Sequence, residues 1–170
     1  MAILHLRKSC KNPRDVEARD AMSMAALLSG MALTNAGLGA VHGFAAPLGA
    51  HFPIPHGVIC ANLLPAVISA NAGALGQDAL QYAHIGQWAA MKSSLPHDEA
   101  IAALISFTKK LLHDLEIPRL SKFGMSESDI PKIVELAKQS SSMKYNPVQL
   151  SDEELAGILR VGIAGYPDAK

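Results

Sequence analysis

Apolar residues recur at spacings of three and four between residues 14 and 36, which is the repeat of a helix with one buried face. Asn12-Pro13 is a typical start for such a helix, and Asn35-Ala36-Gly37 is a typical end. Alanine and methionine are plentiful here and β-branched residues are scarce, which favours helix over strand. We expect Gly30 to let another helix approach closely. The repeating positions are Ala18, Met22, Ala25, Ala26, Ser29, Leu33 and Ala36.

The rest of the chain has further helical patterns. Residues 57–70 are almost continuously apolar, as in a helix buried on nearly every side, and Pro65 is expected to bend it. Residues 78–92 and 96–115 predict two more helices. Two closing helices are expected in "DIPKIVELAKQ", capped by Ser126 or Ser128, and in "DEELAGILRVGI", with a capping box of Ser151 and Glu154.

These patterns predict an all-α fold. No segment alternates apolar and polar residues as a strand does, and no internal repeat or charge block interrupts the chain. We expect a multi-helix bundle of six to eight helices that forms one domain over residues 1–170. Residues 167–170 are expected to fray, as chain ends do when nothing holds them.

Composition narrows the class of protein. The chain has 170 residues, of which 49% are hydrophobic and 18% charged, so it can build a real core. Fifteen basic residues balance fifteen acidic ones and aromatics are only 5%, so nothing indicates a nucleic-acid or membrane partner.

Cysteine usage and the chain start suggest a cytoplasmic protein. Cys10 and Cys60 show no CxxC spacing, which suits a reducing compartment, and Cys60 is expected to be a small core residue. The start "MAILHLRKSC" lacks the features of a signal peptide. No run approaches the ~20 apolar residues that span a bilayer.

Residues 37–65, "GLGAVHGFAAPLGAHFPIPHGVICANLLP", hold three of the seven histidines in an apolar setting. His42 and His56 are each followed by glycine and lie fourteen positions apart. On one straight helix they would be about 21 Å apart along the axis, too far to share a metal ion. Pro47, Pro53 and Pro55 are expected to break this stretch, and Pro53 and Pro55 stop a helix between the two histidines.

A helix–turn–helix with one imidazole on each arm could therefore bring both rings to one metal. The alternative is that both histidines are structural, which is the common role of a histidine in an apolar segment. We expect that common role, or plain surface exposure, for the other histidines outside this segment, which are His5, His84, His97 and His113.

The segment at residues 35–65 resembles the C-terminal signature of the iron-containing (group III) alcohol dehydrogenases. "GLGAVHG", a proline-glycine pair and "PHG" leading into a buried helix carry the resemblance. "NPRDVEARDAMSMAALLSGMAL" is similar to the helix that precedes this signature. "IPRLSKFGMSESDIPKIVELA" and "NPVQLSDEELAGILR" are similar to the closing helices of that family. The resemblance covers nearly all of the chain.

The resemblance implies a function. Members of this family interconvert alcohols with aldehydes or ketones, using NAD(P) and a catalytic divalent metal. By this match His42 and His56 are the two C-terminal metal ligands, and neutral imidazoles suit Fe(II) or Zn(II). Such a metal acts as a Lewis acid on the substrate oxygen, while the nicotinamide carries the hydride.

One position departs from the family pattern. Many relatives have a second histidine four residues after the first ligand, near the nicotinamide and implicated in proton transfer. Here that residue is Ala46. His51 is the nearby titratable residue that could substitute as a catalytic group, and the alternative is a partly exposed histidine in a turn.

Other parts of the family pattern have no match. The resemblance implies two further ligands from a D-x-x-x-H motif, yet no residue four positions before a histidine is acidic. No glycine-rich phosphate loop follows a strand. We therefore expect the metal-binding helical domain of an NAD(P)-dependent alcohol or aldehyde oxidoreductase, inactive alone, with the family's N-terminal nucleotide-binding domain absent. The alternative is a non-catalytic helical association module.

A partner is expected for such a domain. A separate nucleotide-binding domain is one candidate, and a homo-oligomer is the other. We expect the face that carries His42, Phe44, Leu48 and His56 to be exposed and apolar in the isolated chain, which favours association.

Overall fold

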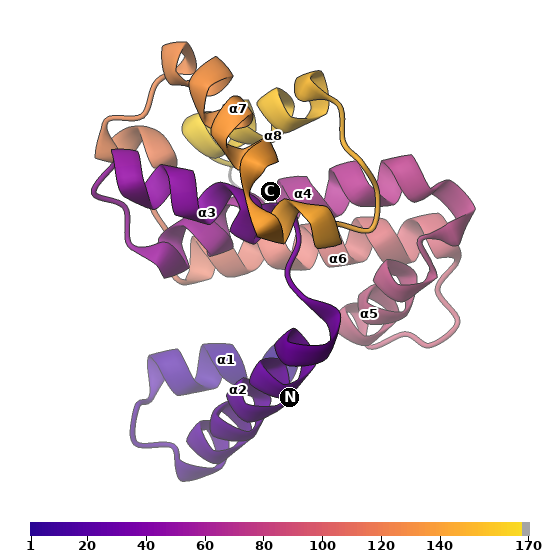
Figure 1. The fold of residues 1–170 in the computed structure, drawn as a ribbon. Coiled ribbons are helices and arrows are strands. Elements are labelled where there is room, and N and C mark those ends of the chain that lie inside the picture. The colour runs from indigo at the N-terminus through magenta and orange to yellow at the C-terminus, as the bar shows by residue number, and fades with distance from the viewer. Residues whose placement is uncertain (168–170) are drawn as a thin grey trace. The chain divides into compact units, whose positions relative to one another are not determined.

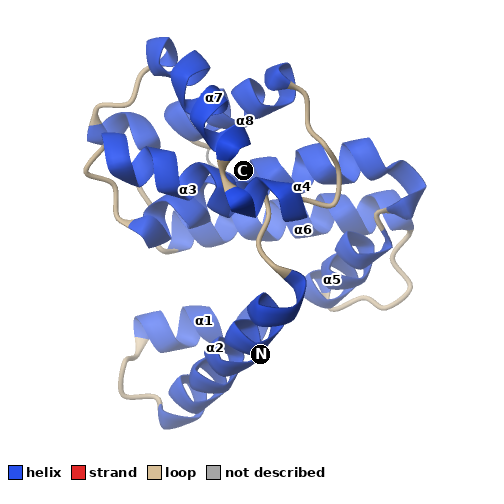
Figure 2. Cartoon of the chain, in the orientation of Figure 1, coloured by secondary structure: helices blue, strands red, loops and turns tan. Residues whose placement is uncertain are grey.

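The computed structural model describes residues 1–167, and this part of the chain is helical without strands (Figure 2). The all-α prediction is confirmed, and the eight α-helices within these residues lie in the expected range. The fraying expected at residues 167–170 concerns positions that, apart from Pro167, lie outside the described residues. The chain divides into two compact units, with the boundary between Gly37 and Leu38. The single domain over residues 1–170 stays a prediction.

The first unit is a pair of contacting helices, α1 (Ala2–Lys11) and α2 (Val16–Ala36) (Figure 1). Asp15 starts α2, because its side chain accepts a hydrogen bond from the backbone amide of Ala18 at 2.9 Å. Gly37 ends α2 with a φ of 71°, as the Asn-Ala-Gly sequence predicts.

The expectation for Gly30 is wrong, since no atom within the described residues lies within 4 Å of the place where its Cβ would be. No helix was predicted for α1, whose Leu4 is exposed, as is Met1 directly before the helix. α2 leaves a row of apolar side chains exposed, which comprises Val16, Met24, Leu27, Leu28, Met31 and Leu33.

The second unit is built around α3 (Ala40–His51) and α4 (His56–Leu75). α7 (Ile130–Gln139) packs against α3, α8 (Asp152–Ala164) packs against α4, and α7 and α8 also contact each other (Figure 1). The largest fully buried side chains are those of Phe44, Leu48, Ile59, Leu63, Leu120, Ile133, Leu155 and Leu159. The core therefore lies where the two arms of the α3–α4 hairpin meet the closing helices.

α5 (Leu80–Ala90) and α6 (His97–Asp114) complete the second unit, and they pack closely on each other. α6 also contacts α4. Both helices lie within the predicted ranges. Four short 3-10 helices fill the connections: η1 (Gly76–Asp78), η2 (Leu120–Phe123), η3 (Glu127–Asp129) and η4 (Ser141–Tyr145).

Some helix ends follow the sequence and others do not. Ser151 and Glu154 form the predicted capping box at the start of α8. Neither Ser126 nor Ser128 caps α7 itself, whose N-cap is Asp129; Ser126 forms a capping box with Asp129 at η3, just before α7. Pro47 does not break the chain as expected but lies inside α3.

One helical segment among the described residues, His56–Asp78, is long and apolar enough to cross a membrane, or two segments if α2 and α3 together are counted as one. The expectation that no run approaches this length was therefore wrong. Half of the most apolar window of His56–Asp78 is buried inside the protein. The core helix of a soluble protein has the same length and composition, so these features are weak evidence for a membrane span.

Candidate metal centre

The turn between α3 and α4 brings the imidazoles of His42 and His56 together. His42 is in the first turn of α3, and His56 is the first residue of α4. The chain reverses in the four residues between the helices, where the amide of Ile54 donates to the carbonyl of Phe52 at 2.8 Å. The two ring centroids are 5.3 Å apart and the rings are tilted by 51°. The hairpin that the prolines predict is therefore present.

A third donor, the thiol of Cys60, lies between the two rings. Its Sγ is 3.4 Å from Nε2 of His56 and 3.8 Å from Nε2 of His42. One ligand atom from each of these three residues lies within 4.8 Å of the other two. Neutral imidazole nitrogen and cysteine sulfur are the donors that Zn(II) and similar metals take from proteins. This donor set therefore fits a divalent transition metal.

Sequence reasoning missed Cys60, which was expected to be an ordinary core residue. The structure leaves it only partly buried, on the same face of α4 as His56. The signal was present in the sequence as His56-x-x-x-Cys60, since residues four apart on a helix lie one above the other. In the family's D-x-x-x-H motif the partner ligand precedes the histidine, whereas here a thiol follows it.

The surroundings of the cluster favour uncharged imidazole at His42. Partial burial lowers the pKa of His42, and the nearby His56 lowers it further by repulsion between the protonated rings. His56 is exposed, so the cluster is open to solvent on one side. Burial raises the pKa of the Cys60 thiol.

The two glycines that follow the histidines have different roles. A Cβ at Gly43 would come within 2.8 Å of the Met143 side chain, so a glycine there allows η4 to pack on α3. Gly57 has no described atom within 4 Å of that position. Only Gly43 is therefore closely packed against another element.

Asn146 fixes the start of α3, two residues before His42. Its Oδ1 accepts a hydrogen bond from the amide of Ala40 at 3.1 Å. It also exchanges two hydrogen bonds with the side chain of Asn71, at 2.7 and 3.1 Å. Asn71 is buried near the end of α4, so this pair joins the two arms of the hairpin far from the turn.

Comparison with known proteins decides the family. The sequence profile of the Fe-containing alcohol dehydrogenase family, C-terminal, matches residues 1–162. The chain belongs to this family. It is 35% identical over 158 residues to 1,3-propanediol dehydrogenase of Klebsiella pneumoniae, a match that covers 92% of this chain and 40% of that protein. It is 34% identical over 143 residues to lactaldehyde reductase of Escherichia coli K12, covering 83% and 37%.

Solved structures agree with this iron-containing alcohol dehydrogenase assignment. The structure of a 1,3-propanediol oxidoreductase superposes with a TM-score of 0.87 at 33% identity, covering 94% of this chain and 42% of that one. The alcohol dehydrogenase from Oenococcus oeni gives a TM-score of 0.84 at 31% identity, with the same coverage of each chain. The chain spans about two fifths of the length of these relatives.

His51 does not join the cluster of this alcohol dehydrogenase domain. It is the last residue of α3, it is exposed, and its Nδ1 is 2.9 Å from the carbonyl oxygen of Pro47. Ala46, where many relatives have a histidine, is also exposed. A role for His51 in proton transfer stays a prediction.

The four remaining histidines lie outside the cluster. Nδ1 of His97 is 2.9 Å from the carboxylate of its neighbour Asp98. His84 and His113 are exposed, and His5 is half-buried. Their arrangement fits the structural or surface role expected for them.

The predicted apolar face around the histidines is wrong. Phe44 and Leu48 are 0% exposed, because they point into the core between α3, α4 and α7. Only the histidines of that set reach the surface. Exposed apolar side chains among the described residues lie instead on α2 and on or directly after α5, where Trp88 and Met91 are the most exposed.

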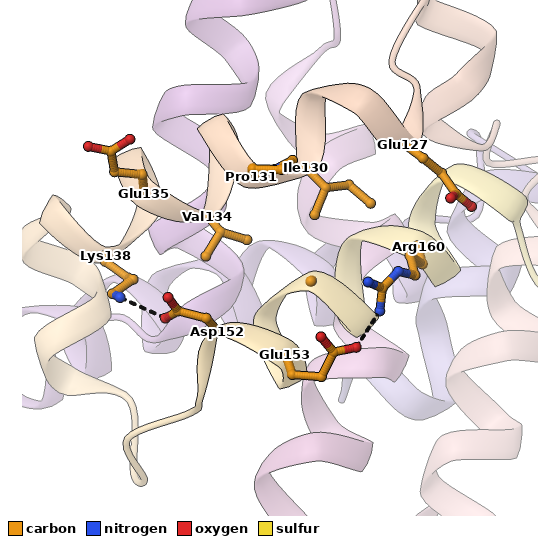
Figure 3. A pocket seen from close by; sticks show the side chains of 10 residues that line it. Glu127, Ile130, Pro131, Val134, Glu135, Lys138, Asp152, Glu153 and Arg160 are labelled. Atoms are coloured by element: carbon orange, nitrogen blue, oxygen red, sulfur yellow. Dashed lines mark hydrogen bonds and ion pairs between the residues drawn. The ribbon is translucent and has the colours of Figure 1, made fainter.

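A separate pocket of about 420 Å³ lies between α7 and α8 and contains none of the cluster residues (Figure 3). Four of its charged side chains form two ion pairs. Lys138 contacts Asp152 at 2.6 Å, and Arg160 contacts Glu153 at 2.7 Å. Both cations are therefore neutralised by carboxylates, and the His42–His56–Cys60 cluster is the better candidate for chemistry.

Proposed function

We propose that this chain supplies the metal-binding helical part of an NAD(P)-dependent alcohol or aldehyde oxidoreductase. One observation carries the proposal: in a chain of the iron-containing alcohol dehydrogenase family, two imidazoles fourteen positions apart have their rings 5.3 Å apart. A thiol lies beside both. In this proposal His42 and His56 hold a divalent metal, Fe(II) or Zn(II).

The metal and the nicotinamide would supply the reactive chemistry, through polarisation of an alcohol or carbonyl oxygen and through hydride transfer. The chain's own part is to hold the ligands in place. Buried Phe44 and Leu48 anchor the arm that carries His42, and buried Ile59 and Leu63 anchor the arm that carries His56. The lowered pKa of His42 keeps it in the neutral form that binds metals.

Substrate and cofactor follow from the relatives by analogy. The relatives named 1,3-propanediol dehydrogenase and lactaldehyde reductase suggest a small alcohol or aldehyde as the substrate. The described residues contain no strand on which a dinucleotide-binding βαβ unit could be built. NAD(P) would therefore be bound by a separate nucleotide-binding domain, and the 170-residue chain alone is expected to lack turnover. A homo-oligomer and a cytoplasmic location also belong to the proposal.

Metal titration tests the site. Zn(II) binding to the purified chain is followed by calorimetry, beside the variants His42→Ala and His56→Ala. Each substitution should remove most of the affinity, whereas His84→Ala, which changes an exposed histidine outside the cluster, should leave it unchanged. If none of the three substitutions matters, the histidines are structural and the chain is a non-catalytic helical association module.

Two further measurements test the remaining parts. Alcohol-dependent NAD(P)H production by the chain alone would contradict the expected inactivity. Sedimentation at micromolar concentration, with and without Zn(II), tests the homo-oligomer, and a monomer under both conditions leaves the separate nucleotide-binding domain as the expected partner.

A further inference from the structure

We propose that Cys60 is a third protein ligand to the metal that His42 and His56 hold. The inference rests on the proposed function, since it concerns the same metal. It adds a sulfur donor that the resemblance does not imply, and with it a preference for thiophilic metals.

The first argument is distance. Ordinary zinc bonds of about 2.0–2.1 Å to nitrogen and about 2.3 Å to sulfur, arranged tetrahedrally, place the two donor atoms about 3.6 Å apart. The Sγ of Cys60 is 3.4 Å from Nε2 of His56 and 3.8 Å from Nε2 of His42. The two separations lie on either side of the expected value, so small side-chain rotations suffice to bind one ion.

The second argument is the identity of the atoms that meet. Both histidines present the same ring atom, Nε2, to the same sulfur. A thiol has one proton and can donate it to only one of the two nitrogens. Hydrogen bonds alone would require opposite states of the two rings, with the thiol donating to one Nε2 and accepting from the N–H of the other, whereas a shared metal takes both Nε2 atoms in the same unprotonated state.

The third argument is that the backbone holds Cys60 in register with His56. The two residues are one helical turn apart, and Ile59 beside Cys60 is completely buried. Asn62, half a turn further, donates from its side chain to the carbonyl of Pro118 at 3.1 Å. This part of α4 is therefore fixed by packing and hydrogen bonds on the face away from the cluster.

The ligand set has consequences for metal choice. Two imidazoles and a thiolate form a three-ligand site that leaves a fourth position open, as catalytic zinc sites do. Thiolate is a soft donor, so the chain should prefer Zn(II) and Co(II) to Mg(II) and Mn(II). His56 is exposed, so a further ligand could reach the cluster from solvent.

Co(II) is the probe that reports sulfur ligation directly. The purified 170-residue chain is titrated with Co(II) under reducing conditions and followed by absorption spectroscopy. We expect a near-ultraviolet thiolate-to-cobalt charge-transfer band in the wild type and in Cys10→Ala, which changes the exposed cysteine of the first unit. The band should be absent in Cys60→Ala and in Cys60→Ser, whose hydroxyl nearly preserves the side-chain volume.

Zinc provides a second readout. Competition with a chromophoric chelator should show that Cys60→Ala weakens Zn(II) binding at least ~10-fold, because even loss of an outer-shell partner has an effect of that size. X-ray absorption of the zinc-loaded wild type should show one sulfur at about 2.3 Å. Circular dichroism of both Cys60 variants checks that the helices remain.

The outcomes separate this inference from the proposed function. If His42→Ala and His56→Ala abolish binding but the wild type shows neither the charge-transfer band nor a sulfur neighbour, Cys60 is not a ligand and the histidine site stands. If the wild type binds neither Co(II) nor Zn(II), or if no variant changes the affinity, both proposals are overturned.

Discussion

The hydroxyl of Tyr166 accepts a hydrogen bond from the backbone amide of Ala66 at 3.2 Å. It also donates to the carbonyl of Asn62 at 3.0 Å, so it bridges the two groups that pair directly in a regular α-helix. Pro65, the residue before Ala66, has no amide hydrogen and disturbs the hydrogen-bond ladder of α4 at this point. A side chain from beyond α8 therefore supports the helix that carries His56 and Cys60.

Replacement of Tyr166 by phenylalanine should destabilise the second unit. Tyr166→Phe removes one donor and one acceptor while keeping the ring, and it leaves two backbone groups without the hydroxyl. We expect the free energy of unfolding to fall by about 1–3 kcal/mol, measured by urea denaturation. Tyr145→Phe, at a largely exposed tyrosine, is the matched control and should have almost no effect.

The same tyrosine predicts a pH dependence. Burial raises the pKa of Tyr166 to about 12, although the hydrogen bond from Ala66 opposes the shift. Because the folded-state pKa exceeds the unfolded value of about 10, the folded state holds this proton more tightly. The contribution to stability is complete below pH ~10 and is lost as the pH rises towards ~12.

The direction of this pH effect is tested by measuring the unfolding free energy of the wild type and of Tyr166→Phe between pH ~10 and ~12. The wild type should lose more stability than the variant, because only the wild type has this group to ionise. Equal losses of stability in the two proteins would show that ionisation of Tyr166 does not cause the loss of stability at alkaline pH. Other groups titrate in both proteins and cancel in the difference.

The sequence was a good guide to the helices because local chemistry sets their ends. Gly37, the prolines before His56 and the capping box at Ser151 each act through their own backbone or through residues three or four positions away. Pro47 was misjudged because its effect depends on tertiary packing. Phe44 and Leu48 on either side of it are completely buried, and their contacts keep α3 continuous across the missing hydrogen bond.

The site was harder to predict, because its geometry depends on residues far apart in the chain. Steric reasoning on Pro53 and Pro55 was enough to predict the hairpin that joins His42 to His56. It could not show that Asn146 fixes the start of α3 across 106 positions. Nor could periodicity show that the surface around Phe44 is covered by α7.

The contact between α5 and α6 yields a sharp prediction at Gly86. A Cβ built there would lie 1.8 Å from the carbonyl oxygen of Ala100, which belongs to the backbone and cannot rotate away. Gly86→Ala must push the two helices apart, and we expect a loss of about 3 kcal/mol or more in unfolding free energy.

Gly73→Ala is the matched control, because nothing lies within 4 Å of that Cβ and α4 should gain about 0.5–1 kcal/mol from the better helix former. The midpoint temperature of thermal unfolding should therefore fall for Gly86→Ala and rise for Gly73→Ala. A small effect of Gly86→Ala would mean that α5 and α6 are not packed backbone to backbone.

Asn146 should link stability to metal binding. Asn146→Leu removes the acceptor for Ala40 and both bonds to Asn71, whose buried amide then keeps only the hydroxyl of Tyr82 as a partner. We expect a loss of about 2–3 kcal/mol, typical of a buried polar group left partly unsatisfied. Because Ala40 lies two residues before His42, Zn(II) affinity should fall as well, although Asn146 itself is not a ligand.

Asn35→Leu, at an exposed asparagine near the end of α2, is the control. It should change neither the free energy of unfolding nor the Zn(II) affinity by much. Urea denaturation measures the free energy of unfolding, and chelator competition measures the Zn(II) affinity. If Asn146→Leu lowers stability but leaves Zn(II) affinity intact, the start of α3 does not position His42. The histidine would then be held by the core contacts of Phe44 and Leu48 alone.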